Sequence, residues 1–156
     1  MIIVGYQGIG KSTLAHSNIN YIDLESSDFY VGTKRVDDWY KPYCKIAEHL
    51  SQQGYYVFVS SHAIVRAELK HSSEPVMCCA PTLELKEFWI DKLRGRFITT
   101  QSRKDYAAWK NAEKEYEANI KDIENSGFPM IWIDSPEYVL SLKICEAEGN
   151  AKKGNI

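Results

Sequence analysis

The chain lacks both a long apolar segment and a strong net charge. None of its apolar runs approaches the roughly 20 residues that a membrane-spanning helix requires. Its 156 residues carry 19 basic and 21 acidic side chains, which give a formal net charge of −2 at pH 7. A nearly neutral chain has no overall attraction to nucleic acid or to an anionic membrane. We therefore expect neither as a partner, and we expect any anion-binding site to be a local cluster of cations.

The chain also lacks the cysteine spacing that is typical of zinc sites and of disulfide-rich proteins. The chain holds four cysteines, none of them in a CxxC pair: Cys44, Cys78, Cys79 and Cys145. This spacing favours reduced thiols, two of them in a buried strand, over a zinc site or a disulfide framework. The apolar run at residues 1–4 leaves no room for a secretory leader before the first glycine. We therefore expect a cytoplasmic protein.

Five short apolar segments alternate with segments of helical periodicity. The expected strands cover residues 1–4, 21–26, 55–61, 76–81 and 129–134. One helix is expected to begin near residue 11, and another is expected after Pro136. Four more are expected over residues 39–53, 63–71, 82–97 and 104–125. Wholly apolar strands are typical of a parallel sheet that helices cover on both faces. The sequence predicts a single α/β domain over residues 1–145 and a disordered polar tail over residues 146–156.

A glycine-rich motif follows the first expected strand. The segment GYQGIGKST, residues 5–13, satisfies the pattern G-x-x-x-x-G-K-[ST] and precedes an expected helix. Glycines let consecutive backbone N–H groups converge on phosphate oxygens, and the helix N-terminus adds its positive end. The lysine would reach the β- and γ-phosphates, and the serine hydroxyl would bind Mg²⁺. We predict that a nucleotide is held by Gly8, Ile9, Gly10, Lys11, Ser12 and Thr13.

With this loop the chain resembles the P-loop kinase family, which includes adenylate, guanylate, thymidylate and shikimate kinases. The family's loop reads G-x-x-G-x-G-K-[ST]-T, and a weaker resemblance in the order of elements extends over most of the chain. The resemblance implies a three-layer P-loop NTPase fold, with ATP and Mg²⁺ as cofactors. The N-K-x-D motif of translation-type GTPases occurs nowhere in the sequence. A GTPase of that type is therefore excluded.

Acidic residues follow the second expected strand, in DLESSDF. Ligands of parallel α/β sheets bind beyond the carboxyl ends of the strands, and alternation puts Asp23 and Glu25 on one side. By the resemblance, Asp23 would orient Mg²⁺ or its waters, and Glu25 would bind or deprotonate the acceptor. The alternative is a solvated acidic loop in which Asp28 caps the next helix. Ser60 and Ser61 stand where many nucleotide kinases carry a second Mg²⁺-anchoring aspartate, which shifts that role to Ser12 and Asp23.

Aromatic and basic residues interleave after this acidic segment. Family members place an acceptor-binding insert there, at about residues 26–54 of this chain, where aromatic rings stack on a base and cations hold its phosphate. The resemblance implies that Phe29 binds the acceptor. It also implies that Arg66, one helical turn beyond His62, binds and helps to activate the acceptor phosphate. The alternative is that the rings are the packing face of a small helical insert.

A basic stretch free of acids, RGRFITTQSRK, covers residues 94–104. It joins two expected helices, which is the position of the mobile lid in the family. By the resemblance, Arg94 would bind ATP and Arg103 would act on the γ-phosphate, where a lid also expels water. A solvated basic helix end is the alternative for Arg94 and Arg96. By the resemblance, residues 134–137, after the fifth strand, correspond in position to a loop that often touches the nucleotide base in the family.

These patterns predict a kinase that moves the γ-phosphoryl group of ATP-Mg to a small-molecule acceptor, a nucleoside monophosphate, as a monomer or a homodimer. A shikimate- or gluconate-like kinase is the first alternative, suggested by the Asp23-x-Glu25 pair. A hydroxyl acceptor needs a base, whereas a phosphate acceptor is already an anion. A P-loop nucleotide-binding or switch protein without kinase activity is the second alternative.

Overall fold

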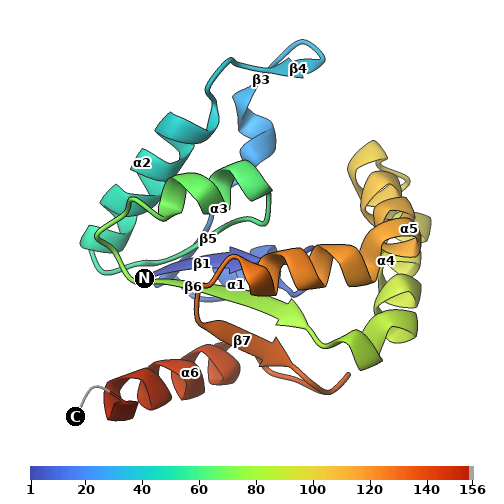
Figure 1. Ribbon diagram of the computed structural model, residues 1–156. Helices are drawn as coiled ribbons and strands as arrows, with labels where there is room; N and C mark the ends of the chain where they lie inside the picture. The colour runs from blue at the N-terminus through green and yellow to red at the C-terminus, as the bar shows by residue number, and fades with distance from the viewer. Residues whose placement is uncertain (155–156) are drawn as a thin grey trace.

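A five-stranded parallel sheet forms the centre of the computed structural model, which describes residues 1–154 (Figure 1). In the order β2-β5-β1-β6-β7, the strands span Tyr21–Asp23, Tyr56–Ser60, Ile2–Gly5, Val76–Pro81 and Met130–Ile133. Most side chains of the three inner strands are buried, as expected for apolar strands covered on both faces. The predicted α/β class and the parallel sheet are confirmed.

Helices cover both faces of this sheet. The six α-helices are α1 (Lys11–Ser17), α2 (Tyr40–Gln52), α3 (Ala63–Leu69), α4 (Lys86–Thr100), α5 (Arg103–Asn125) and α6 (Leu140–Gly154). The crossover from β1 to β2 runs toward one edge of the sheet, and the later crossovers run toward the other. Because crossovers are right-handed, α1 lies on the face opposite to α2, α3 and α5. Figure 1 shows α2 and α3 above the sheet and α6 below it, a three-layer, Rossmann-like arrangement.

Helices α4 and α5 form a hairpin beyond the carboxyl ends of the strands. Their connection is a turn at Gln101, which has a positive φ of 55°, and Ser102, whose Oγ accepts the N–H of Asp105 at 3.1 Å. Figure 1 shows that the second half of α5 turns away from α4 and crosses above the sheet. The bend lies at Glu115, where φ is −130°. The basic stretch 94–104 is therefore almost entirely helical, and the loop expected there is only this turn.

The bend in α5 brings together side chains that a straight helix would separate. The Asn119 amide donates to Oδ1 of Asn111 at 2.8 Å, although eight residues of straight helix rise roughly 12 Å. Gln7, in the loop after β1, donates to the Ala108 carbonyl at 3.0 Å. The first half of α5 is therefore tied directly to that loop.

The expectation for the end of the chain was wrong. Helix α6 continues to Gly154, so residues 146–154 are not a disordered tail; residues 155–156 lie outside the described residues. At the start of the expected insert lie the 3₁₀ turn η1 (Ser26–Phe29) and an antiparallel hairpin, β3 (Tyr30–Val31) and β4 (Lys34–Arg35). A second 3₁₀ turn, η2 (Leu83–Leu85), precedes α4. No helix within residues 1–154 is long and apolar enough to cross a membrane.

The carboxyl ends of β2 and β5 are joined by the buried side chain of Tyr43 on α2. Its hydroxyl donates to the Leu24 carbonyl at 2.6 Å and accepts the backbone N–H of Ser60 at 2.8 Å. A backbone donor and a backbone acceptor of two neighbouring strand ends thus depend on one hydroxyl group. The loops that follow β2 and β5 both border the candidate site, so this group sets their spacing.

We expect Tyr43→Phe to lower the free energy of unfolding by about 1–3 kcal/mol, because it leaves two partly buried backbone groups without this partner. Urea denaturation followed by circular dichroism measures the change. The control is Tyr40→Phe, on the same helix, where the hydroxyl makes no hydrogen bond to residues 1–154. Equal stabilities of the two variants would show that the Tyr43 hydroxyl is not the link between the strand ends.

Candidate functional site

The glycine-rich loop connects β1 to α1 at a switch point of the sheet. Strand β1 pairs with both β5 and β6, and the chain leaves β1 and β6 toward opposite edges of the sheet. Ligands of open α/β sheets bind in the crevice that such a divergence creates. Gly8 and Gly10 have positive φ angles of 83° and 101°. An added Cβ at Gly8 would also lie 3.0 Å from Leu93 Cδ2, so both backbone and space require glycine there.

Lys11 folds back over the start of the loop. Its ammonium donates to the Gly5 carbonyl at 3.0 Å, and a Cβ at Gly5 would lie 2.7 Å from Lys11 Cδ. Burial lowers the pKa of Lys11, against the opposing effect of the Asp23 and Glu25 carboxylates. The lysine is therefore held close to the loop backbone. A bound anion there would favour its charged, protonated form.

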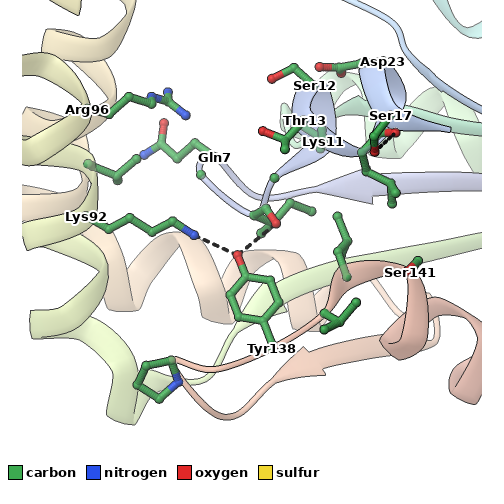
Figure 2. A pocket seen from close by; sticks show the side chains of 18 of the residues that line it. Gln7, Lys11, Ser12, Thr13, Ser17, Asp23, Lys92, Arg96, Tyr138 and Ser141 are labelled. Atoms are coloured by element: carbon green, nitrogen blue, oxygen red, sulfur yellow. Dashed lines mark hydrogen bonds between the residues drawn. The ribbon is translucent and has the colours of Figure 1, made fainter. Parts of the chain in front are cut away.

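A first cleft of about 1010 Å³ opens between this loop, α4 and the turn before α6 (Figure 2). Residues 8–13, all predicted to hold a nucleotide, line it together with Asp23 and Glu25. Pro136, within the segment expected to meet a base, also lines it. Further lining residues that the sequence did not single out are Gln7, Lys92 and Tyr138.

The predicted Mg²⁺ ligands, Ser12 and Asp23, both line the first cleft and are labelled side by side in Figure 2. Burial raises the pKa of Asp23, and the charge of Lys11 opposes that rise. Within the described residues, no group of three or more His, Cys, Asp or Glu side chains is arranged to hold a metal. One hydroxyl and one carboxylate nevertheless fit Mg²⁺, which usually keeps several waters and binds substrate phosphates.

A second cleft of about 970 Å³ lies on the other side of the loop. It is bordered by η1, the β3–β4 hairpin, the start of α3 and the inner side of α5. Five residues line both clefts: Gln7, Lys11, Glu25, Arg96 and Lys104. The two clefts therefore meet at Lys11.

Cations dominate the wall of the second cleft. Arg103 and Lys104 reach it from the start of α5, and Arg35 reaches it from β4. The Arg35 guanidinium lies 4.7 Å from the ring centroids of Tyr30 and Trp39 and donates to Ser26. The interleaved aromatic and basic residues of the insert were the sequence signal for this arrangement, although they did not single out Arg35.

Two carboxylates at the junction are already paired with cations. Glu25 Oε2 lies 2.7 Å from Lys104 Nζ; burial works to raise the pKa of Glu25, but the hydrogen bond and charge of Lys104 outweigh it, so the pKa is lowered. Asp105 lies 2.7 Å from Arg96 Nε. Burial works to raise the pKa of Asp105, and hydrogen bonds from Thr100 and Ser102, with the charge of Arg96, lower it overall. Glu25 is therefore a stable carboxylate.

Arg66 borders the second cleft, but its guanidinium is occupied. It is buried and forms an ion pair with Asp122, and it also donates to the Asp122 carbonyl at 2.9 Å and the Ser61 carbonyl at 3.1 Å. These contacts join α3 to the second half of α5. The structure therefore gives Arg66 a packing role, and an acceptor phosphate would have to compete with Asp122 for it.

Two other predicted residues lie away from the clefts. Phe29 packs against Trp39 and Tyr43, with ring centroids 6.4 and 5.6 Å apart, and is not among the residues that line the second cleft. Arg94 is exposed on α4 and lines neither cleft. Helical phase explains this, because Lys92 and Arg96, four residues apart, share the face of α4 that Arg94 does not. The i, i+4 spacing was the signal that could have found them.

No protein-family model and no curated protein matches this chain. The fold defines a class, the three-layer α/β domains of Rossmann-like architecture. The function must be inferred from the two clefts and the loop between them.

The lowered pKa of Glu25 predicts a measurable effect of Lys104. We expect Lys104→Met to raise the pKa of the Glu25 carboxyl, because it removes the hydrogen bond and the charge that offset burial. The stabilisation from this pair is present above the unfolded-state pKa of a glutamate and is lost as the pH falls through the lowered folded-state value. A ¹³C NMR titration of the carboxyl groups reports the change. Lys114→Met, on the exposed face of α5, is the control; equal titration curves would mean that Lys104 does not perturb Glu25.

Proposed function

We propose that this protein is an ATP-dependent phosphotransferase that moves the γ-phosphoryl group of ATP to a nucleoside monophosphate. The observation that carries the proposal is the pair of clefts that share Lys11. Two substrates bound in them would bring a donor phosphate and an acceptor together over one lysine and one glycine-rich loop. Each cleft has the size of a typical small-molecule site.

The donor fits the first cleft. Backbone N–H groups of the loop and the N-terminus of α1 suit the β-phosphate, and Lys11 suits the β- and γ-oxygens. Ser12 and Asp23 would hold Mg²⁺, which would supply positive charge to the phosphate groups. The turn at Pro136 and Tyr138 closes the end of this cleft where a nucleoside would lie.

The acceptor fits the second cleft, and its charge pattern favours an anion. Arg35 and Arg103 line this cleft, while Asp122 is paired with Arg66 and Glu25 is paired with Lys104. A phosphate oxygen of the acceptor would attack the γ-phosphorus, and the bond to ADP would break in line. The cations would stabilise the charge on the transferred group without any proton transfer.

The alternative acceptor, a hydroxylated metabolite, requires a base to take the hydroxyl proton. Glu25 is the carboxylate closest to this role, and its lowered pKa and its ion pair with Lys104 make it a weak base. A nucleotide switch without an acceptor would have no use for the second cleft. Both alternatives are therefore less well supported than the monophosphate kinase.

The direct test is a substrate screen. We expect Mg-dependent ADP production from ATP that is stimulated by at least one of the common ribo- or deoxynucleoside monophosphates, and not by shikimate or gluconate. ADP release is followed by a coupled enzyme assay. Stimulation by a hydroxylated metabolite alone would support the first alternative, and ATP binding without acceptor-dependent turnover would support the switch.

Lys11→Met should lower kcat by about 10²- to 10³-fold, because it removes a cation that acts on the transferred phosphoryl group. The measurement is steady-state ADP production with the acceptor found in the screen. Lys34→Met, on the exposed β4 strand, is the matched control and should keep full activity. Unchanged turnover in Lys11→Met, with the fold verified by circular dichroism, would contradict the assignment of the loop.

Glu25→Gln separates the two acceptor classes. With a phosphate acceptor we expect kcat to fall less than about tenfold, whereas loss of a general base costs about 10²- to 10⁴-fold. Asp28→Asn, an exposed acid in η1, is the control for the loss of one negative charge. A loss above 10²-fold confined to Glu25→Gln would identify a hydroxyl acceptor.

A further inference from the structure

Two side chains from outside the glycine-rich loop bind its backbone, and a third side chain binds one of these two. Trp89 on α4 donates its indole N–H to the Gln7 carbonyl at 2.8 Å. Tyr138, in the turn before α6, donates its hydroxyl to the Ile9 carbonyl at 2.9 Å. Lys92, one helical turn beyond Trp89, donates to the Tyr138 hydroxyl at 2.8 Å, and Figure 2 shows this chain of contacts from Lys92 to the loop.

These three side chains form one packed unit. The Trp89 and Tyr138 rings are stacked, with centroids 6.0 Å apart and an interplanar angle of 26°. The Lys92 ammonium lies 4.5 Å from the centroid of the Trp89 ring and 5.0 Å from that of Tyr138. Because an ammonium group only donates, its contact directs the tyrosine proton toward the Ile9 carbonyl. Trp89 is fully buried, so its end of the unit is held by the core.

The two carbonyls that this unit binds are those that precede the loop's left-handed glycines. In a trans peptide unit, the C=O of one residue and the N–H of the next point in opposite directions. Holding the carbonyls of Gln7 and Ile9 toward α4 and Tyr138 therefore turns the N–H groups of Gly8 and Gly10 away from them. Gly8 and Gly10 have the positive φ values that this orientation uses. Oriented backbone N–H groups of this kind form anion-binding nests.

We propose that Tyr138 and Trp89 are positioning residues of the phosphate loop. They hold two loop carbonyls outward, so that the N–H groups of Gly8 and Gly10 are set for phosphate oxygens before a nucleotide arrives, and Lys92 fixes the Tyr138 hydroxyl in its donating orientation. Preorganised donors of this kind bind an anion without first reordering the backbone. This role rests on the proposed function, because it assumes that the loop binds phosphate.

Tyr138→Phe tests the role, because it keeps the ring stack and removes only the hydroxyl. We expect the Kd of the Tyr138→Phe protein for Mg-ATP, and for inorganic tripolyphosphate, to rise about three- to tenfold, the range that corresponds to one lost hydrogen bond. Isothermal titration calorimetry measures both constants. Tyr56→Phe is the matched control: its hydroxyl donates to Glu148 at 2.7 Å at the amino end of β5, away from both clefts.

Tripolyphosphate distinguishes an effect on the loop from a contact with the nucleoside. If Tyr138→Phe weakens Mg-ATP but not tripolyphosphate, Tyr138 contacts the nucleoside and the positioning role is wrong. Unchanged affinity for both ligands would also overturn it. If the unaltered protein binds neither ligand, the proposed function fails, and the inference fails with it. Thermal unfolding of both variants shows whether a changed affinity reflects a changed fold.

A double-mutant cycle tests the part assigned to Lys92. If Lys92 acts only through the Tyr138 hydroxyl, Lys92→Met should weaken tripolyphosphate binding in the unaltered protein and add no further loss in the Tyr138→Phe background. A further loss of the same size in that background would mean that Lys92 contacts the phosphate itself. That result would overturn its role as a support for Tyr138.

Discussion

The parallel hydrogen bonds that β1 exchanges with β5 on one side and β6 on the other hold the start of the glycine-rich loop in the middle of the sheet. Every feature of the candidate site is placed relative to that loop. The first cleft opens on the side of α4 and α6, and the second opens on the side of the insert and α5. Because β1 is wholly buried and paired along its length, the loop has a rigid base from which its glycines can turn.

The α4–α5 hairpin is the second organising element. Its base is joined to the loop through Trp89, and its inner side is joined to the loop through Gln7 and Ala108. Its cations therefore fall into distinct groups. Arg96 is paired within the hairpin and Lys104 is paired with Glu25 across the junction, and both line the two clefts. Arg103 lines the second cleft but not the first. A basic stretch that looks uniform in sequence thus has several structural environments.

The elements with strong local signals were predictable. Apolar runs located all five sheet strands, and periodicity located the helices to within a few residues. The loop residues 8–13 were found because motif and position agree, and they do line a cleft. The short β3–β4 hairpin has no such signal, since two-residue strands carry little pattern. The continuation of α4 from residue 98 to Thr100 was missed, because the helix was expected to end at residue 97 and the basic stretch was interpreted as a lid between two helices.

Sequence alone determined the fold class, the place of the loop and the types of side chain available around it, because these depend on local patterns of polarity and glycine. Tertiary structure decided which of those side chains face a cleft. Arg66 and Arg94 are cations in suitable segments. The Arg66 guanidinium, however, is paired with Asp122, and the helical phase of α4 directs Arg94 away from both clefts. Trp89, Lys92 and Tyr138 carry no motif, and they meet the loop only because α4 and the turn before α6 pack beside it. Contacts between segments 80 or more residues apart depend on the packing of whole elements, which no local pattern records.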